Sequence, residues 1–450
     1  MSFSHCLHNL STLAITVTLI SLLAVSPSLA NENLTAWTTK MPITFSGYNP
    51  PDGGAPLTNF PALITFSHNI NNSGFDYSLF LSPPYGDLRF TADDHITPLD
   101  FEVESWDTEG TSYVWVNVPE LTSSTTIYAL WGMNNVLPPP CTTNGTVWSD
   151  AFTAVWHMNS ADLVTDSTVN KNHGIGKNGI TVSGNGIIGN TLELNNAAAH
   201  YVDCGNSLLI NKDDATLSIW LKTNAEADSL MGVIGKSIRA SARRYSIHLS
   251  NSQIHAVFQA STSAQASANW TYGDNQWHHI LVSFDRTGDA TIFIDGQAKA
   301  SVSIATQANT AIDNPTRFMI GVYGNSNGSG PETGSYFAGA MDEARLMNSA
   351  ASPAWVWAEY MNIASNEIFN SYGAVDSSGL RITYEGNIVP NSATATPYYG
   401  TAFGVVLTNS SSVNHTFTIS NPGDEAITLT GTEPVTLSGS TSFNITAQPH

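Results

Sequence analysis

Basic side chains are scarce in this sequence. It contains 15 Lys and Arg residues against 36 Asp and Glu residues, a formal net charge of −21 over 450 residues. Such a surface repels phosphate groups, so we expect neither nucleic acid nor an anionic membrane surface as a partner. Charged residues make up only 11% of the chain, which also disfavours coiled coils and helical arrays.

Long apolar runs are absent after the N-terminus. By contrast, the segment from Leu13 to Val25 is almost continuously apolar, and residues 1–30 contain no Lys, Arg, Asp or Glu. Ser28 and Ala30 provide small residues at the −3 and −1 positions of a cleavage site. Because the run is short for a ~30 Å hydrocarbon core, we favour a signal peptide cleaved after Ala30 over a retained anchor helix. We therefore predict a secreted or cell-surface protein without membrane insertion.

Cysteine is also scarce, with three residues in the chain. Cys6 lies in the predicted signal peptide, so only Cys141 and Cys204 remain after cleavage. An even pair in an oxidising compartment often forms a disulfide bond. Such a bond would tie the linker to the following domain, and two unrelated buried thiols are the alternative. The spacing fits no zinc pattern.

Glycine, serine, threonine and asparagine are abundant, which favours short strands joined by turns. Three regions follow the signal peptide: residues 34–137, which end at a proline-rich linker, residues 147–372, and residues 380–450. Period-two alternation, as in residues 112–118, predicts strands with two distinct faces. One helix is expected to begin with Ser352 as N-cap and to run to about Ile363. The predicted fold class is therefore all-β.

Several motifs in the middle region occur in the order typical of one family. Residues 274–285, followed by residues 291–296, resemble a signature of LamG-like jelly-roll domains, the concanavalin A-like lectin/glucanase group. Residues 214–222 resemble the early strand of this group, residues 337–346 its late strand, and residues 154–158 its opening strand. The resemblance implies a jelly-roll sandwich over residues 147–372.

The flanking regions resemble two other bacterial families. The first region resembles the domain of unknown function 2341 family, which gives no activity. The stretches that carry this resemblance are residues 86–90, 99–106, 114–119 and 127–132. Residues 403–431 are similar to the immunoglobulin-like choice-of-anchor D repeats. About seventy residues hold too few strands for a complete sandwich of roughly seven, so we expect residues 380–450 to be a partial repeat of a longer protein.

Glycan-cleaving enzymes on the concanavalin A-like fold need two carboxyl groups roughly 5–10 Å apart. Asp342 and Glu343 are neighbours on a predicted strand, so their side chains are expected to point to opposite faces and not to act together. Glu102 and Glu104 have the right spacing but lie in the first region, where we interpret them as part of a solvated strand face. We therefore predict no catalytic residues and no enzyme.

The LamG-like resemblance implies one structural calcium ion, held by oxygen ligands in loops. The candidate ligands are Asp166, Asn172, Asp203 and Asp342. The alternative is that these side chains form turns and caps, as Asp and Asn do throughout the chain.

Carbohydrate recognition needs aromatic rings and polar side chains on a solvent-exposed rim. The loop of residues 321–335 is the expected rim of the binding face. The candidate ligand-binding residues in or near Gly-, Asn- and Ser-rich loops are Tyr272, Tyr323, Asn325, Asn327 and Tyr336. Packing of the tyrosines in the core is the alternative.

These features together predict a non-catalytic, extracellular binding protein that recognises carbohydrate through the jelly roll. The first alternative is a structural or adhesive surface protein with protein partners. A glycan-cleaving enzyme is the second alternative, which the lack of a carboxylate pair in the jelly roll disfavours.

Overall fold

The computed structural model describes residues 32–51, 53–225, 230–238, 243–313 and 315–377, together with short stretches between 381 and 447. The predicted signal peptide lies outside the described residues, as does most of the 380–450 region. Strands predominate, and the predicted all-β class is confirmed. Within the described part of the chain, no helix is both long and apolar enough to cross a membrane.

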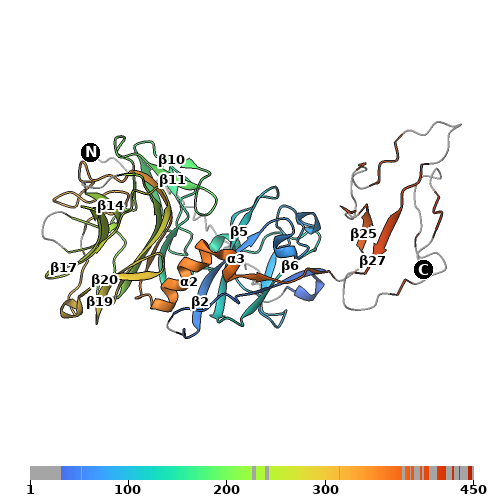
Figure 1. Cartoon of the computed structure of the whole chain (residues 1–450), viewed down its shortest axis with the longest axis horizontal. Helices are drawn as coiled ribbons and strands as arrows, with labels where there is room; N and C mark the ends of the chain where they lie inside the picture. Colours follow the sequence, from blue (N-terminus) through green and yellow to red (C-terminus); the bar gives the residue numbers. More distant parts are fainter. Residues whose placement is uncertain are drawn as a thin grey trace, which may run out of the picture.

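The N-terminal domain consists of two antiparallel sheets around an aromatic core (Figure 1). One sheet has the order β2-β5-β4, and the other has the order β23-β1-β6-β3 with β24 also beside β1. The strands are β1 (Thr39–Thr44), β2 (Leu57–Phe66), β3 (Arg89–Thr91), β4 (Phe101–Ser105), β5 (Ser112–Leu121), β6 (Thr126–Trp131), β23 (Ser371–Tyr372) and β24 (Asp376–Ser377). The short helix α1 (Cys141–Asn144) follows the proline-rich linker.

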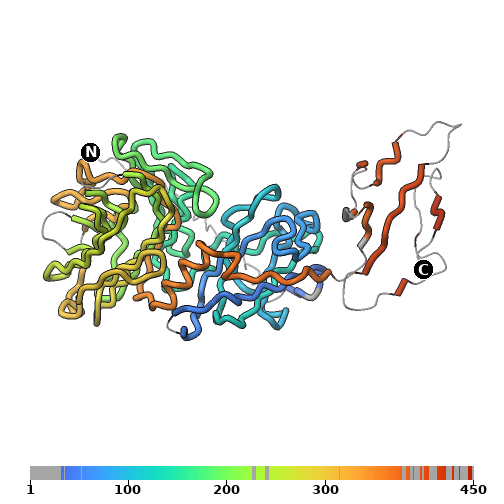
Figure 2. The backbone as a smooth tube through the Cα atoms, in the orientation of Figure 1, coloured from blue at the N-terminus to red at the C-terminus, as the bar shows by residue number. Residues whose placement is uncertain are grey.

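Two strands of this domain come from the far end of the middle region and from the residues directly after it. Ile43 of β1 is paired with Tyr372 of β23, and Thr39 is paired with Ser377 of β24. Figure 2 shows the chain after the jelly roll running back along the first strand. The N-terminal sheet therefore contains residues from both sides of the jelly roll.

The middle region is a jelly roll of two eight-stranded antiparallel sheets with one large apolar core. The first sheet contains β7 (Phe152–Trp156), β10 (Thr181–Ser183), β11 (Thr191–Leu194), β13 (Ala215–Lys222), β18 (Trp277–Phe284), β19 (Asp289–Ile294), β20 (Gln297–Ser303) and β22 (Gly339–Met347). The second contains β8 (Leu163–Val164), β9 (Gly174–Lys177), β12 (Tyr201–Asp203), β14 (Met231–Lys236), β15 (Arg244–Ser250), β16 (Gln253–Gln259), β17 (Ser263–Asn269) and β21 (Phe318–Ile320).

Helix α2 (Pro353–Ala364) lies between the two domains (Figure 1). It begins as predicted, because the Ser352 side chain accepts a hydrogen bond from the Trp355 amide and proline occupies the first turn. Val356 packs on the jelly-roll sheet against Leu281 and Phe293. Near its other end, Asn362 caps the Leu63 amide of β2 at 2.9 Å, and the short helix α3 (Asn366–Phe369) follows. The helix therefore contacts both domains.

An apolar cluster completes the junction between the domains. Side chains from β2 and β5 meet side chains from the start and end of the jelly roll there. The buried members are Leu63, Trp115, Val147, Trp148, Phe152, Val155, Ile188 and Met347. Beyond the jelly roll, the described residues form a small sheet of β25 (Arg381–Tyr384), β26 (Asn387–Ile388) and β27 (Phe417–Ser420).

Candidate functional site

Glu102 and Glu104 of β4 point into the junction between the domains. Glu102 accepts hydrogen bonds of 2.7 Å from the Trp148 indole N–H and from the Ser167 hydroxyl, both in the region that follows the linker. Glu104 accepts a hydrogen bond of 2.7 Å from the Trp115 indole N–H, and its side chain is only 2% exposed. The predicted solvated face is therefore wrong, because the jelly roll covers it.

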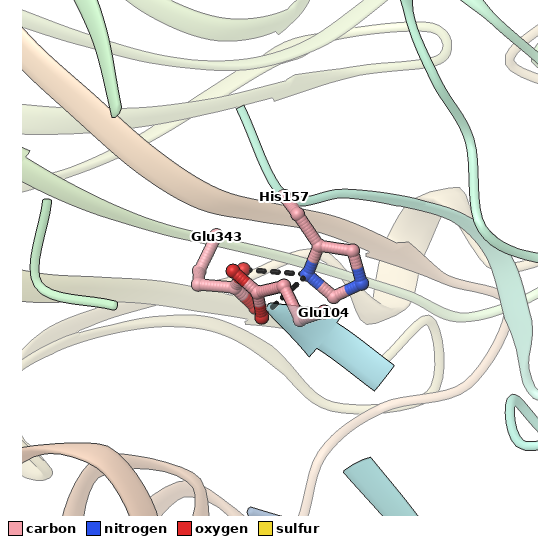
Figure 3. A group of neighbouring side chains, drawn as sticks. All are labelled: Glu104, His157 and Glu343. Atoms are coloured by element: carbon pink, nitrogen blue, oxygen red, sulfur yellow. Dashed lines mark hydrogen bonds and ion pairs between the residues drawn. The ribbon is translucent and has the colours of Figure 1, made fainter. Parts of the chain in front are cut away.

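His157, directly after β7, meets these carboxyl groups from the jelly-roll side (Figure 3). Its Nδ1 atom lies 2.6 Å from Glu343 Oε1 and 3.3 Å from Glu104 Oε2. Its Nε2 atom lies 3.8 Å from Glu102 Oε2, an ion-pair distance rather than a hydrogen bond. We call Glu102, Glu104, His157, Asp342, Glu343 and Arg345 the junction cluster.

A β-bulge in β22 brings Asp342 and Glu343 into the same cluster. The pairing of β22 with β13 shifts register between Ser218 and Trp220, and Glu343 has a φ of 47°. The bulge breaks the alternation of side chains along the strand. Burial raises the pKa of Asp342, and the negative charge of Glu343 raises it further. The two adjacent carboxyl groups nevertheless have different partners, because Asp342 accepts hydrogen bonds from the backbone amides of Ile187 and Ile188, whereas Glu343 contacts His157 and Arg345.

Arg345 supplies a permanent positive charge beside Glu343. Its Nη2 atom donates a hydrogen bond of 2.7 Å to Glu343 Oε2, and its Nη1 atom lies 3.5 Å from Glu359 Oε1 of α2. The guanidinium carbon lies 4.6 Å from the ring centre of Trp115 and 5.3 Å from that of Trp148. Arg345 thus connects carboxylates of β22 and α2 with aromatic rings of the junction.

The protonation states of the junction cluster differ from those of exposed side chains. Burial raises the pKa of Glu104 to about 8, with a further contribution from the negative charge of Glu343. Burial alone would lower the pKa of His157, but Glu343 and Glu104 raise it well above its usual value. For Glu343, the positive charges of His157 and Arg345 outweigh burial, and the pKa is lowered. At neutral pH we therefore expect a charged His157, a charged Glu343 and a protonated Glu104.

The geometry of Glu104, His157 and Glu343 would also allow metal coordination. Their ligand atoms lie within 4.8 Å of one another, and within the described part of the chain no other group of three or more His, Cys, Asp or Glu side chains converges in this way. One imidazole and two carboxylates suit a transition metal. All three side chains have protein partners, however, and are at most 4% exposed. His157 and Arg345 place two positive charges beside these carboxylates, while His157 Nε2 and Arg345 Nε have no hydrogen-bond partner among the residues that the structure describes.

Replacing Glu104 by glutamine is expected to increase stability relative to the wild type as the pH rises. The pKa of Glu104 in the folded protein, about 8, exceeds the ordinary value near 4.3. Protonated Glu104 therefore makes its full contribution to the free energy of unfolding below about pH 4, and this contribution is lost as the pH rises through 8. Because glutamine stays neutral, the free energy of unfolding of the variant should rise relative to that of the wild type by up to about 1 kcal/mol per pH unit in this window. Urea unfolding at pH 5, 7 and 9 measures this difference. If the free energy of unfolding had the same pH dependence in Glu104→Gln, in the exposed control Glu120→Gln and in the wild type, the raised pKa of Glu104 would be contradicted.

The predicted calcium ligands do not form one group. The Asp166 carboxylate accepts hydrogen bonds from the backbone amides of Val155, Thr168 and Asn172, which is the turn-forming arrangement given as the alternative. Asp203 pairs with Arg317, whose Nε atom lies 2.7 Å from Asp203 Oδ1 and 2.8 Å from Oδ2. Asp342 belongs to the junction cluster. The structure therefore brings Asp166 and Asn172 together, and gives each of the three aspartates protein partners.

The predicted ligand-binding tyrosines are less accessible than expected. Tyr272 is 2% exposed and Tyr323 is 4% exposed, which agrees with the alternative that these tyrosines pack in the core. Tyr323 accepts a hydrogen bond from Arg244 and packs on the ring of His248, which accounts for its burial. Tyr336 is half-buried, with its ring centre 6.1 Å from that of Tyr201.

Within the loop of residues 321–335, the two candidate asparagines stabilise the turn. Asn325 and Asn327 both accept hydrogen bonds from the Ser329 amide, and Asn327 also accepts one from the Ser329 hydroxyl. Asn327 is exposed and Asn325 is half-buried. Their side-chain oxygens are therefore partly engaged within the loop.

The predicted disulfide bond is wrong. Cys141 and Cys204 are both free and buried. Cys141 packs in the core of the N-terminal domain, whereas Cys204 packs in the core of the jelly roll. Each thiol is enclosed by its own apolar core, as in the alternative of two unrelated buried thiols.

Sequence reasoning missed the roles of His157, Arg345 and Glu359. All three lie within or next to motifs that resemble ordinary family strands and a helix, and their partners are distant in the sequence. The one available signal was the pair Glu102 and Glu104, two residues apart beside aromatic side chains. Such a pair identifies a shared face of a strand, but not what covers that face.

Comparisons with family models agree with the architecture. Residues 196–357 match the model of the concanavalin A-like lectin/glucanases superfamily, and residues 84–153 match that of the domain of unknown function DUF2341. A comparison with curated proteins finds no match. The resemblance of residues 380–450 to choice-of-anchor D repeats remains a prediction.

Among solved structures, the binding domain of Paraclostridial Mosquitocidal Protein 1 matches with a TM-score of 0.39 and 17% identity, over 47% of this chain and 52% of that one. The chain thus spans about half the length of that domain. Domain 4 of AbnA, a GH43 extracellular arabinanase from Geobacillus stearothermophilus in complex with arabinotriose, matches with a TM-score of 0.37 and 21% identity, over 46% of this chain and 96% of that one. The binding domain of Botulinum neurotoxin serotype D matches with a TM-score of 0.37 and 13% identity, over 53% and 55%.

The order of the two family matches is the order expected from the sequence motifs, and both lie within the described domains. The chain therefore carries a DUF2341 region followed by a domain of the concanavalin A-like lectin/glucanases superfamily.

Proposed function

We propose that this chain is a non-catalytic binding protein that recognises carbohydrate. The observation that carries this proposal is the match of residues 196–357 to the concanavalin A-like lectin/glucanases superfamily. A fold by itself does not determine function, so the proposal rests on the family and on the properties of the surface. The strongly acidic chain disfavours polyanionic partners and leaves neutral polymers as the preferred class.

The placement of the carboxyl groups supports binding without cleavage. Hydrolysis of a glycosidic bond requires two carboxyl groups that flank the substrate. The closely spaced carboxyl groups of Glu104 and Glu343 are buried between the domains, where a sugar chain cannot reach them. We therefore propose that they hold the domains together and do not cleave glycans.

The proposed setting is extracellular. The apolar segment within residues 1–30 supports export as a secreted or cell-surface protein. A structural calcium ion in the jelly roll is part of the same proposal and can be tested with a chelator.

Binding to a glycan array tests this proposal. The chain without residues 1–30 is applied once with calcium and once with EDTA. We expect saturable binding to one class of glycan, weakened by EDTA if calcium supports the binding surface. Binding that EDTA leaves unchanged would remove the metal and keep the function. An array without any bound glycan would contradict carbohydrate recognition and favour a structural or adhesive surface protein.

A further inference from the structure

A cleft opens to solvent at the junction of the two domains, separate from the buried junction cluster. It has a volume of about 390 Å³, within the range of roughly 300–1,000 Å³ that is common for small-molecule sites. The cleft is lined by residues of β2, of the segment before β7 and of the segment between β22 and α2. The members used below are Thr58, Asn59, Asp150, Ser352 and Trp355.

Trp355 provides a fixed aromatic surface in this cleft. Its indole N–H donates a hydrogen bond of 3.0 Å to Glu359 Oε2, and its ring packs edge-on against Phe60 with ring centres 5.2 Å apart. The side chain is nevertheless only half-buried. A tryptophan held on one side and accessible on the other can pack against the apolar face of a sugar ring.

The polar side chains around Trp355 are available for a ligand. Among the described residues, the side chains of Thr58, Asn59 and Asp150 form no hydrogen bond or ion pair with the rest of the protein, whereas the Ser352 hydroxyl caps helix α2. Asp150 is exposed, and it engages Asn348 only through its backbone oxygen. Carboxylate and amide groups of this kind bind the hydroxyls of a saccharide.

Asn59 occupies a strained backbone position within strand β2. Its φ of 52° lies in the left-handed region, which is uncommon for a residue inside a strand. Asparagine adopts this region more readily than most residues with a side chain, and glycine is the substitution that preserves it.

The charge of the cleft restricts the class of ligand. Its lining contains no Lys, Arg or His, and Asp150 is its one ionisable side chain. An anionic sugar would meet a carboxylate without a compensating cation. A neutral sugar instead offers hydroxyl donors to that carboxylate.

We propose that this cleft binds a neutral saccharide, with one sugar ring against Trp355 and hydroxyl groups donating to Asp150 and Asn59. The inference rests on the proposed carbohydrate-binding function and assigns its site. It places the site between the two domains and not on the loop of residues 321–335, whose asparagine oxygens are engaged with Ser329.

Binding of variants to the same glycan array, followed by calorimetric titration, tests the site. The soluble probes are xylotriose, cellotriose, maltotriose and arabinotriose as neutral sugars, with trigalacturonic acid as an acidic one. Asp150→Ala and Asn59→Gly remove the polar groups, and glycine retains the left-handed backbone at position 59. Trp355→Phe tests the aromatic surface. The matched controls are Asn327→Ala and Tyr336→Phe in and beside the alternative loop.

We expect the wild type and both controls to bind a neutral probe, and Asp150→Ala to weaken binding by about tenfold or more, since a hydrogen bond to a charged group is lost. Unchanged binding by all three cleft variants, with loss in the loop variants, would overturn the site and leave the proposed function standing. Binding of only the acidic probe would overturn the neutral class. A wild type that binds no glycan would overturn both proposals.

Discussion

Replacing Arg345 by methionine is expected to lower the free energy of unfolding by about 3–5 kcal/mol. Arg345 lies 2.7 Å from Glu343 and 3.5 Å from Glu359, and both carboxylates are at most 3% exposed. Methionine fills much of the same volume but supplies no charge. The variant therefore leaves two buried carboxylates without this partner, which costs far more than loss of an exposed pair. Urea unfolding at pH 7, followed by tryptophan fluorescence, measures the effect.

The chain offers a matched control for this variant. Lys40 also pairs with a carboxylate, that of Asp376 at 3.1 Å, but these two side chains are 40% and 28% exposed. Because water screens an exposed pair, Lys40→Met should cost no more than about 1 kcal/mol. If Arg345→Met and Lys40→Met were equally mild, the junction cluster would contribute little to stability.

Replacing His157 by leucine is expected to cost a similar amount, about 3–5 kcal/mol. The imidazolium holds Glu343 at 2.6 Å and Glu104 at 3.3 Å, so its loss leaves two carboxyl groups facing each other without the charge between them. The raised pKa of His157 sets the pH dependence. Charged His157 makes its full contribution to the free energy of unfolding below about pH 6.5, and this contribution is lost as the pH rises through the pKa that His157 has in the folded protein. The difference between wild type and variant should therefore shrink in alkaline solution.

A double variant separates this charge effect from simple loss of packing. In His157→Leu/Glu343→Gln the carboxylate that keeps only Arg345 as a positive partner is also neutralised, and we expect part of the stability to return. His278→Leu is the control, because His278 is 17% exposed and pairs with Asp274 and Asp295 at the surface. Additive losses in the double variant would show that packing, and not charge, accounts for the effect.

Much of the fold could be predicted because its signals are local. Ser352 and Pro353 predicted the start of helix α2, which the structure confirms. Asp-Gly directly after an apolar run, as in residues 291–296, is typical of a tight hairpin. Asp295 and Gly296 have φ values of 51° and 74°, as a turn with two left-handed residues requires. Each of these features depends on a few consecutive residues.

The candidate site could not be predicted in the same way, since it depends on contacts between distant residues. The face that contains Glu102 and Glu104 is indistinguishable in sequence from a solvated strand face until the jelly roll covers it. The orientation of Glu343 depends on a bulge opposite residues 218–220, and no residue near Glu343 indicates that bulge. The polar lining of the cleft comes from three segments, and Asn59 and Trp355 are almost three hundred positions apart in the sequence.

The pairing of β1 with β23 and β24 has a consequence for how the protein is made. Synthesis proceeds from the N-terminus, so Thr39–Thr44 and its neighbour β6 emerge from the ribosome long before Ser371–Tyr372 and Asp376–Ser377. Until then one edge of β1 has no partner, and an unpaired edge invites association with other chains. The jelly roll is an insertion between the two halves of one sheet. The nascent N-terminal domain must wait for the whole jelly roll to be translated before its sheet is complete.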